Sequence, residues 1–503
     1  MDNNSQSNIK KRSKKALIIL LLCLLLVFLI PFLTVAATVA LVDPVYKETF
    51  VGELGEKYDL LNSTDSKKIV FVGGSSLAFG LDSTLVKQHL SMEPVNLGLY
   101  ANLGTKIMLD LSLSNINRGD VVIVAPEMNE QTLSLYFNAE TAMQALDGNL
   151  HMLKSIDYDD YGSLVGALWG FTSAKLGYAI SGERPENSGA YRKENFNSYG
   201  DNVFDRPYNV MSTVQKSISL DFNYDKSDGI NTGYEEFIDY LNAYAKKIEE
   251  RGADVYFSFP PMNAAALKDE CTAERINGFY KNLARSLNFR IISNPHDYIL
   301  DEGYFFDSEF HLNNAGVTVR TATLIDDIKR EMGRTDITIA TDDLPEPPGY
   351  APLDFAAGDS KNLYFDLIPA KNGAGQDVWK IAGLNAEGML QTSIIIPNNI
   401  DGIPVIGVEP YAFRGSEIRS LLVGDNVTYL ASNSLSGAEH LESVYINKAS
   451  PDAISVPNGA DENGLITDGK NPSLKIFIPA EGMELYKADY FWSDYTAYLR
   501  SKP

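Results

Sequence analysis

The sequence predicts a mixed α/β fold, in which a doubly wound parallel sheet forms the largest domain. Between residues 66 and 333, short apolar, β-branched runs alternate with segments whose apolar residues recur every three or four positions. The chain has 503 residues, enough for roughly three ordinary domains. Its 45% hydrophobic and 22% charged residues are values typical of globular proteins, which excludes a disordered or polytopic membrane chain.

Five apolar runs are predicted to be the buried strands of this sheet: 69–72, 94–98, 121–125, 255–259 and 290–293. Helices are predicted between and after them, over residues 103–116, 234–250, 272–287 and 315–332. Strands that alternate with helices imply a parallel sheet with helices on both faces. The stretch 130–230 is too long for one crossover connection, so it predicts an inserted region of helices and loops over one end of the sheet.

The first 42 residues predict a membrane anchor. Five basic residues between positions 10 and 15 precede residues 16–42, a run of 27 positions without a charge. About 20 apolar residues span a bilayer as a helix, and a basic flank keeps its own end in the cytoplasm. We therefore expect a cytoplasmic tail over 1–15, a single transmembrane helix over 16–42, a juxtamembrane segment over 43–65 and an extracellular remainder. A cleavable signal peptide is the alternative, although its apolar core is usually about 7–15 residues long.

Composition excludes several classes of function. Asp and Glu number 66 against 43 Lys and Arg, which gives a formal net charge of −23 and makes nucleic acid a poor partner. The two cysteines are too few for a disulfide scaffold or a Cys-rich zinc site. No cluster of His, Asp and Glu has metal-ligand spacing, so neither a metal nor another cofactor is expected.

The C-terminal part of the chain carries a degenerate repeat. Residues 334–377 include a Pro-rich stretch and predict a linker to this part, which covers 378–503. Two blocks recur at offsets of 22 and 23 residues: Tyr411 to Gly415 with Asn433 to Gly437, and Ile418 and Leu421 with Leu441 and Val444. A period in the low twenties is typical of leucine-rich solenoids.

A candidate nucleophile follows the first predicted strand. Gly73 and Gly74 precede Ser75 and Ser76, and a helical segment comes next. Glycines at a strand-to-helix turn let the backbone bend sharply and expose a side chain at the carboxyl edge of the sheet. The N–H groups of the helix N-terminus add positive potential there, so a serine can act as a nucleophile if a base is near. The alternative is that either serine only caps the helix.

A candidate base comes from the far end of the same domain. His311 lies in the loop between the last predicted strand and the last predicted helix, so it too belongs at the carboxyl edge. The other histidines are placed on a surface helix, in the insertion, in a loop and in the repeats: His89, His151, His296 and His440. Asp307 or Glu309 can orient His311. Residues 200–208 of the insertion are candidates to line the cleft, with ordinary loop packing as the alternative.

These residues resemble the sequence blocks of the SGNH or GDSL hydrolases. Residues 74–80, Gly-Ser-Ser-Leu-Ala-Phe-Gly, resemble the first block, in which Gly-Asp-Ser-Leu is followed by a glycine four residues after the serine. That register implies Ser76 as the nucleophile. His311 with an upstream acid, Asp307 or less favourably Glu309, resembles the last block.

The middle blocks imply the groups that would stabilise an oxyanion. Residues 96–101 resemble the second block, which implies the backbone N–H of Ala101 as a donor. The third block is represented only by residues 125–129, which implies the Asn129 side chain, with Glu127 as the alternative at this edge of the sheet. The resemblance covers about residues 66–333 and implies a flavodoxin-like, three-layer sheet.

Two departures from the family pattern indicate a particular branch. Asp307 stands four residues before His311 instead of three, and Ser75 replaces the aspartate of Gly-Asp-Ser. Both resemble the Gly-Ser-Ser branch of membrane-anchored envelope proteins, which includes relatives of teichoic-acid D-alanyl transfer and alginate O-acetylation proteins. This branch implies acyl-ester chemistry on envelope glycopolymers, or acyl transfer from a membrane partner.

The repeat region resembles the BspA-like leucine-rich repeats of bacterial surface proteins. The resemblance rests on the Ile-Pro motifs at 396–397 and 478–479, the Ala-Phe unit at 412–413 and the final Trp492. It implies adhesion or docking, with a spacer role as the alternative. We therefore expect a membrane-anchored, extracellular serine esterase or O-acyltransferase whose partners are an envelope polysaccharide, the membrane and a membrane acyltransferase. An inactive scaffold and a surface adhesin are the alternatives.

Overall fold

The computed structural model describes residues 29–502 apart from 31–32, 40, 183, 186–188, 210, 212–213, 215, 221–233, 350–357, 457–463, 467–473 and 490. The expected cytoplasmic tail and most of the expected transmembrane helix, 16–42, lie outside the described residues, so the anchor stays a prediction. Among the residues that are described, no helix combines the length and the apolar character needed to cross a membrane.

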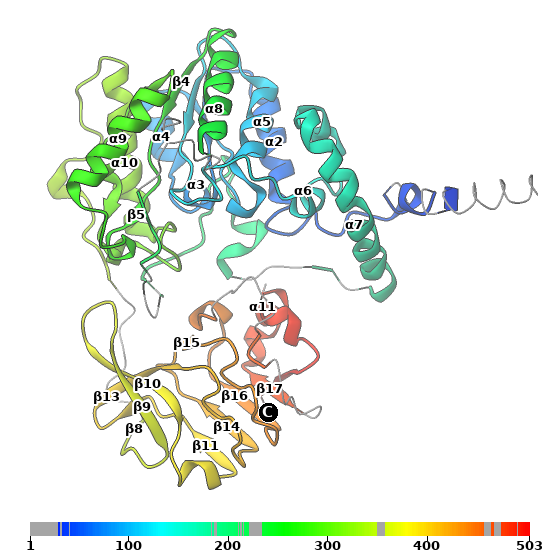
Figure 1. Cartoon of the computed structure of the whole chain (residues 1–503), viewed down its shortest axis with the longest axis vertical. Helices are drawn as coiled ribbons and strands as arrows, with labels where there is room; N and C mark the ends of the chain where they lie inside the picture. The colour runs from blue at the N-terminus through cyan, green and yellow to red at the C-terminus, as the bar shows by residue number, and fades with distance from the viewer. Residues whose placement is uncertain are drawn as a thin grey trace, which may run out of the picture.

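Five parallel strands form the central sheet of the α/β domain (Figure 1). They are β1 (Lys68–Val72), β2 (Glu93–Asn96), β3 (Val121–Val124), β4 (Asp254–Phe257) and β6 (Arg290–Ile291). Their order is β2-β1-β3-β4-β6, with every neighbouring pair parallel. The predicted α/β class and the five predicted strands are confirmed. A separate short parallel pair is formed by β5 (Met262–Asn263) and β7 (Ile299–Leu300).

Helices cover both faces of the sheet, because successive side chains of a strand point to opposite faces. Ile69 and Phe71 of β1 share a core with α4 (Ser83–Leu90) and α10 (Asn314–Glu331). Val70 and Val72 share the opposite core with residues of α2 (Glu53–Ser63), α5 (Thr105–Ser112), α8 (Tyr234–Glu249) and α9 (Ala273–Ser286), among other helices. The helices predicted at 234–250, 272–287 and 315–332 are confirmed; the one predicted at 103–116 is shorter, and a 3₁₀ turn over Leu113–Asn115 continues it.

The described residues of the predicted insertion contain two α-helices, α6 (Ala139–Ala145) and α7 (Tyr161–Ser181), with short 3₁₀ turns around them. Buried polar contacts tie its later loop to the sheet. Lys57 Nζ donates to the carbonyls of Asn96 and Gly200, and Asp201 accepts from Ser83 and Asn96. Asp201 therefore packs the loop against the sheet. This agrees with ordinary loop packing, the alternative given for residues 200–208.

The described part of the repeat region forms two sheets. The first has the order β8 (Asp359–Ser360), β12 (Asn399–Ile400), β13 (Ile403–Val408), β10 (Asp377–Leu384) and β9 (Phe365–Lys371), with β15 (Tyr429–Leu430) paired to β13. The second is parallel throughout: β11 (Ser393–Ile395), β14 (Ser420–Val423), β16 (Ser443–Ile446), β17 (Lys475–Ile478) and β18 (Leu499–Ser501). The helix α11 (Met483–Ala488) precedes β18. The linker predicted over 334–377 is thus too long at its C-terminal end, because β9 lies inside it and pairs with β10.

The predicted repeat offsets correspond to stacked turns and strands. Leu421 of β14 is the register partner of Val444 of β16, 23 residues later. The N–H of Tyr411 donates to the carbonyl of Asn433, 22 residues later, at 2.9 Å. Both of these residues have positive φ, 60° and 63°, so the same unusual turn is repeated in successive units. These contacts explain the repeat period physically.

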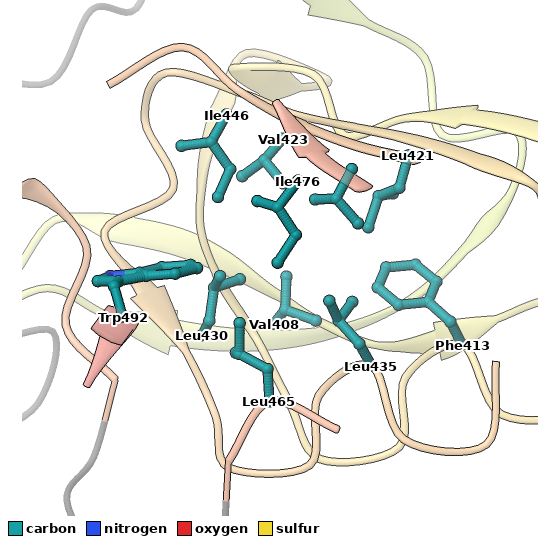
Figure 2. A pocket seen from close by; sticks show the side chains of 11 residues that line it. Val408, Phe413, Leu421, Val423, Leu430, Leu435, Ile446, Leu465, Ile476 and Trp492 are labelled. Carbon is teal, nitrogen blue, oxygen red and sulfur yellow. The ribbon is translucent and has the colours of Figure 1, made fainter. Parts of the chain in front are cut away.

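The core of the repeat region encloses a cavity of about 10 Å³ (Figure 2). Aliphatic side chains from successive units line it, together with two aromatic rings, Phe413 and Trp492. A cavity needs about 10–15 Å³ and polar partners to hold one water molecule. This space is therefore a packing defect in a dry core and not a ligand site.

Candidate active site

The turn after β1 positions two serines at the carboxyl edge of the sheet. Gly73 and Gly74 make this turn, and the short helix α3 (Ser75–Ala78) follows directly. A Cβ on Gly73 would lie 2.4 Å from the carbonyl oxygen of Ala125, and one on Gly74 would lie 2.7 Å from Glu127 Oε1. The first of these contacts is with backbone, so only glycine at position 73 allows the chain to pass this close to the end of β3, whereas a side chain at position 74 would displace the Glu127 carboxylate.

His311 reaches the same edge from the loop before α10. The N–H of Phe306 donates to the carbonyl of His311 at 2.8 Å, and the N–H of His311 donates to Ser308 Oγ at 3.1 Å. Asn313 then caps α10 by accepting from the N–H of Gly316. These contacts fix the backbone around His311, whose side chain is buried.

The two loops meet, and three side chains form a hydrogen-bonded chain. His311 Nε2 lies 2.8 Å from Ser75 Oγ, and His311 Nδ1 lies 2.7 Å from Asp307 Oδ1. The expected pairing of His311 with Asp307 is confirmed. The carboxylate of Glu309, the alternative acid, makes no hydrogen bond with His311 in the described structure; its backbone carbonyl accepts from the N–H of Asn263.

The serine that the family register implied is not the one that faces the histidine. Ser76 is completely buried, and its Oγ has no hydrogen-bond partner among the described residues. Successive residues of a helix are rotated by about 100°, so when Ser75 faces His311 its neighbour turns into the domain. The prediction that Ser76 pairs with His311 is therefore wrong. Ser75 forms this contact instead.

Aromatic rings hold the imidazole of His311 in place. The ring of Phe79 stacks on it with centroids 4.3 Å apart and planes within 14°. The guanidinium of Arg206 lies over the same Phe79 ring, 5.0 Å from its centroid. Phe50, from the segment before α2, contacts the rings of both Phe79 and Tyr191. Neither Phe50 nor Phe79 was expected at the site, since an apolar ring in a sequence signals only burial.

Tyr191 extends the hydrogen-bonded chain by one group. Its hydroxyl donates to Asp307 Oδ2 at 2.8 Å and lies 3.3 Å from His311 Nδ1. Burial and the neighbouring Asp307 carboxylate raise the pKa of Tyr191 well above its usual value, so the phenol keeps its proton and remains a donor. Tyr191 comes from the insertion, 116 residues away from Asp307, and no motif in the sequence indicated it.

The Asp307 carboxylate is stabilised in its charged form. Burial alone would raise its pKa, but the charge and hydrogen bond of His311, the hydrogen bond from Tyr191 and the charge of Arg206 together lower it. Arg206 is itself buried, which lowers its pKa to about 10, and it donates to the carbonyls of Leu312 and Phe79. A charged Asp307 can therefore orient His311 and stabilise a positive imidazolium.

A second carboxylate, Glu127, lies against Ser75. Glu127 follows β3; its Oε1 is 3.1 Å from Ser75 Oγ and accepts the backbone N–H of Ser76 at 2.8 Å. The Ser75 hydroxyl has one hydrogen, so it can donate either to His311 or to Glu127. Only the first arrangement makes His311 a base. Glu127 also occupies a helix N-terminal N–H that would otherwise be open to a developing oxyanion.

The two expected oxyanion donors lie in neighbouring turns. Ala101 begins the 3₁₀ turn Ala101–Leu103 after β2. The Asn129 side-chain oxygen accepts from the N–H and hydroxyl of Thr132, so it caps the next turn. No hydrogen bond connects either residue to Ser75 or His311 in the described structure, and their oxyanion roles stay predictions.

The repeat region contacts the turn that carries Tyr191. Asp452, in the 3₁₀ turn Pro451–Ala453, packs against Gly189 of the turn Gly189–Tyr191. Gly189 has a φ of +56°, and a Cβ there would lie 1.8 Å from the carboxylate oxygen of Asp452. Burial, together with Asp489 and Asp307, raises the pKa of Asp452 to about 6. The protonation state of the Asp452 carboxyl group is thus linked to the turn that carries Tyr191.

Comparisons with known proteins identify no relative of this chain. No protein-family model and no curated protein matches this chain. Within the described ranges, no group of three or more His, Cys, Asp and Glu side chains is placed to hold a metal ion. The other histidines lie elsewhere: His151 pairs with Asp59, His296 with Asn277, His440 with Glu417, and His89 lies beside Lys329.

Proposed function

We propose that this chain is an SGNH-type serine esterase or O-acyltransferase. The observation that carries the proposal is the continuous hydrogen-bonded chain from Ser75 through His311 to Asp307. Serine, histidine and carboxylate in this order activate a hydroxyl for attack on an ester carbonyl. The strand order 2-1-3-4-5, counted along the main sheet, supports the flavodoxin-like arrangement that the sequence resemblance implies.

In the proposed reaction, His311 takes the hydroxyl proton as Ser75 Oγ bonds to the acyl carbon. Collapse of the tetrahedral intermediate breaks the ester C–O bond, and His311 returns the proton to the leaving alkoxide. Water or a sugar hydroxyl then attacks the acyl group, with His311 as base again, and Ser75 regains its proton. Asp307 holds the imidazole tautomer throughout, while Tyr191 and Phe79 keep both groups in position.

The setting proposed for this reaction follows from the N-terminal sequence. A helix over 16–42 would hold the domain at the outer face of the cell membrane, where acyl esters of envelope glycopolymers are the available substrates. The BspA-like repeats would then contact polysaccharide or protein at the same surface. An acyltransferase in the membrane would be the donor if the chain transfers acyl groups instead of hydrolysing them.

Glu127 favours a second candidate, an inactive scaffold of the same fold. An ionised carboxylate beside Ser75 can take the hydrogen that His311 needs, and it repels a developing oxyanion. At about 4 Å and an effective dielectric constant of about 20, that repulsion is about 4 kcal/mol. The scaffold would bind a glycopolymer or the acyltransferase without reacting.

Hydrolysis of a small acetyl ester by the full-length protein distinguishes the two candidates. The proposal expects Ser75→Ala and His311→Ala to reduce kcat/KM by at least 10³-fold. Ser76→Ala is the matched control: it removes a hydroxyl one residue away that has no hydrogen-bond partner, so it is expected to retain activity. Equal rates for the wild type and all three variants would exclude the esterase. A loss with Ser76→Ala alone would restore the register implied by the family resemblance.

A further inference from the structure

The long helix of the insertion, α7, exposes a face without charge. Of its 21 residues, Tyr161–Ser181, only Lys175 is charged. Lys175 is buried and forms an ion pair with Asp147 at 2.6 Å, with both side chains 2% exposed. The buried side of the helix also includes Leu164 and Phe171, which pack into the domain. An amphipathic helix on a soluble surface normally carries charged residues on its outer face, and α7 has none there.

Large apolar side chains lie on this outer face. Val165, Trp169, Leu176 and Ile180 are 69%, 59%, 37% and 79% exposed. At about 100° per residue, these four side chains fall within about 60° of one another around the helix axis. Next to them runs a line of glycines, none with an atom within 4 Å of its Cβ position: Gly162, Gly166, Gly170 and Gly177. The outer face of α7 is thus uncharged, with a stripe of large apolar side chains beside glycines and a few exposed serines, among them Ser173.

A second observation places this helix beside the expected anchor. The ring of Tyr46 contacts the rings of Phe171 and Tyr178 of α7, each with centroids 6.0 Å apart. Asp147, the partner of Lys175, accepts from the N–H of Val45 at 2.6 Å. Tyr46 is only four residues beyond position 42, so a fully extended chain could separate them by about 14 Å at most. Figure 1 shows α7 in teal at one flank of the α/β domain, next to the blue N-terminal segment.

We propose that the outer face of α7 lies in the interfacial layer of the lipid bilayer. The inference rests on the anchor at 16–42 that forms part of the proposed function. Thr38 is already buried and Val39 packs against the core of the domain, so the chain leaves the bilayer before these residues. Because it then packs on α7 through Tyr46, it holds the helix at the membrane surface. Tryptophan prefers the membrane–water interface, and an uncharged apolar stripe gains free energy when it leaves water. The α/β domain then rests on the membrane along α7 instead of hanging from a free tether.

Trp169 makes the proposal measurable. The sequence has three tryptophans, and the other two, Trp379 and Trp492, lie in the repeat region. Full-length protein would be reconstituted into phosphatidylcholine liposomes whose acyl chains carry bromine near the headgroup or near the bilayer centre. We expect shallow bromine to quench part of the tryptophan fluorescence more strongly than deep bromine. That part should disappear in Trp169→Phe and persist in Trp379→Phe.

A charge on the stripe gives a second variant with a matched control. Val165→Asp introduces a carboxylate at a site that is 69% exposed, so folding should not depend on it. It is expected to reduce the bromine quenching of Trp169 by half or more. Val203→Asp, at a site 61% exposed in the insertion but outside α7, is expected to leave the quenching unchanged.

Each other outcome overturns the proposal in a recognisable way. If the protein does not float with the liposomes, the anchor itself fails. If it floats but iodide in the aqueous phase quenches Trp169 freely and bromine does not, the anchor stands and α7 faces water. If neither quencher reaches Trp169, a protein covers the helix, either a second copy or a membrane protein packed on the glycines.

Discussion

Replacing Asp452 by asparagine should stabilise the repeat region at neutral pH. The pKa of Asp452 is about 6 in the folded protein, against 3.8 for a free aspartate, because burial and the carboxylates of Asp489 and Asp307 disfavour its charge. Between these two pH values the folded state holds a proton that the unfolded state has lost. Stability therefore falls as the pH rises through this window. A shift of about two units corresponds to about 3 kcal/mol.

Asp452→Asn removes the charge and keeps an oxygen that can accept from Ser450. We expect the variant to be more stable than the wild type by up to about 3 kcal/mol at pH 7, and by about 1 kcal/mol near pH 4.5. Urea unfolding followed by tryptophan fluorescence in a Trp169→Phe background measures this, because Trp379 and Trp492 both report on the repeat region. Equal stability at pH 7, or a difference that does not change with pH, would refute the reasoning.

Three further predictions concern the site and its rim. Glu127→Gln should raise kcat/KM on a neutral ester at least 10-fold, because it removes a negative charge beside the oxyanion; a fall in rate would mean that the carboxylate takes part in the reaction. Tyr191→Phe removes a hydrogen bond to a buried carboxylate and should lower kcat about 10-fold at unchanged KM. Steady-state kinetics in which only KM rises would contradict this prediction. Gly189→Ala should destabilise the protein by at least about 1 kcal/mol more than Gly182→Ala, as measured by urea unfolding. Both glycines have positive φ, but only Gly189 has a neighbour at the Cβ position, so equal effects would argue against the contact with Asp452.

Much of the α/β domain could be predicted because its signals are local. The central strands β1 and β3 are apolar runs rich in Val and Ile, and the amphipathic helices have clear periodicity and stop signals. The meeting of His311 with the serine turn also followed from topology, since loops at the carboxyl ends of parallel strands share one edge. The repeat offsets translated directly into strand register, as Leu421 and Val444 illustrate.

The missed features depend on geometry that a sequence does not carry. The family register implied Ser76, whereas the rotation between successive helical residues decides that Ser75 faces His311. Tyr191 and Phe79 act through tertiary packing and have no motif of their own. The linker was overextended because β9 includes a proline and polar residues, which weaken a strand signal; its pairing with β10 overrides that local preference.

The position of Phe50 limits how far the reactive hydroxyl can travel. Its ring packs on Phe79 and Tyr191, only eight residues after position 42. If residues 16–42 are embedded as proposed, a fully extended strand of that length allows about 28 Å of reach. Ser75 would then stay within a short distance of the lipid surface. A long polymer would be modified only on the segments that lie close to the membrane.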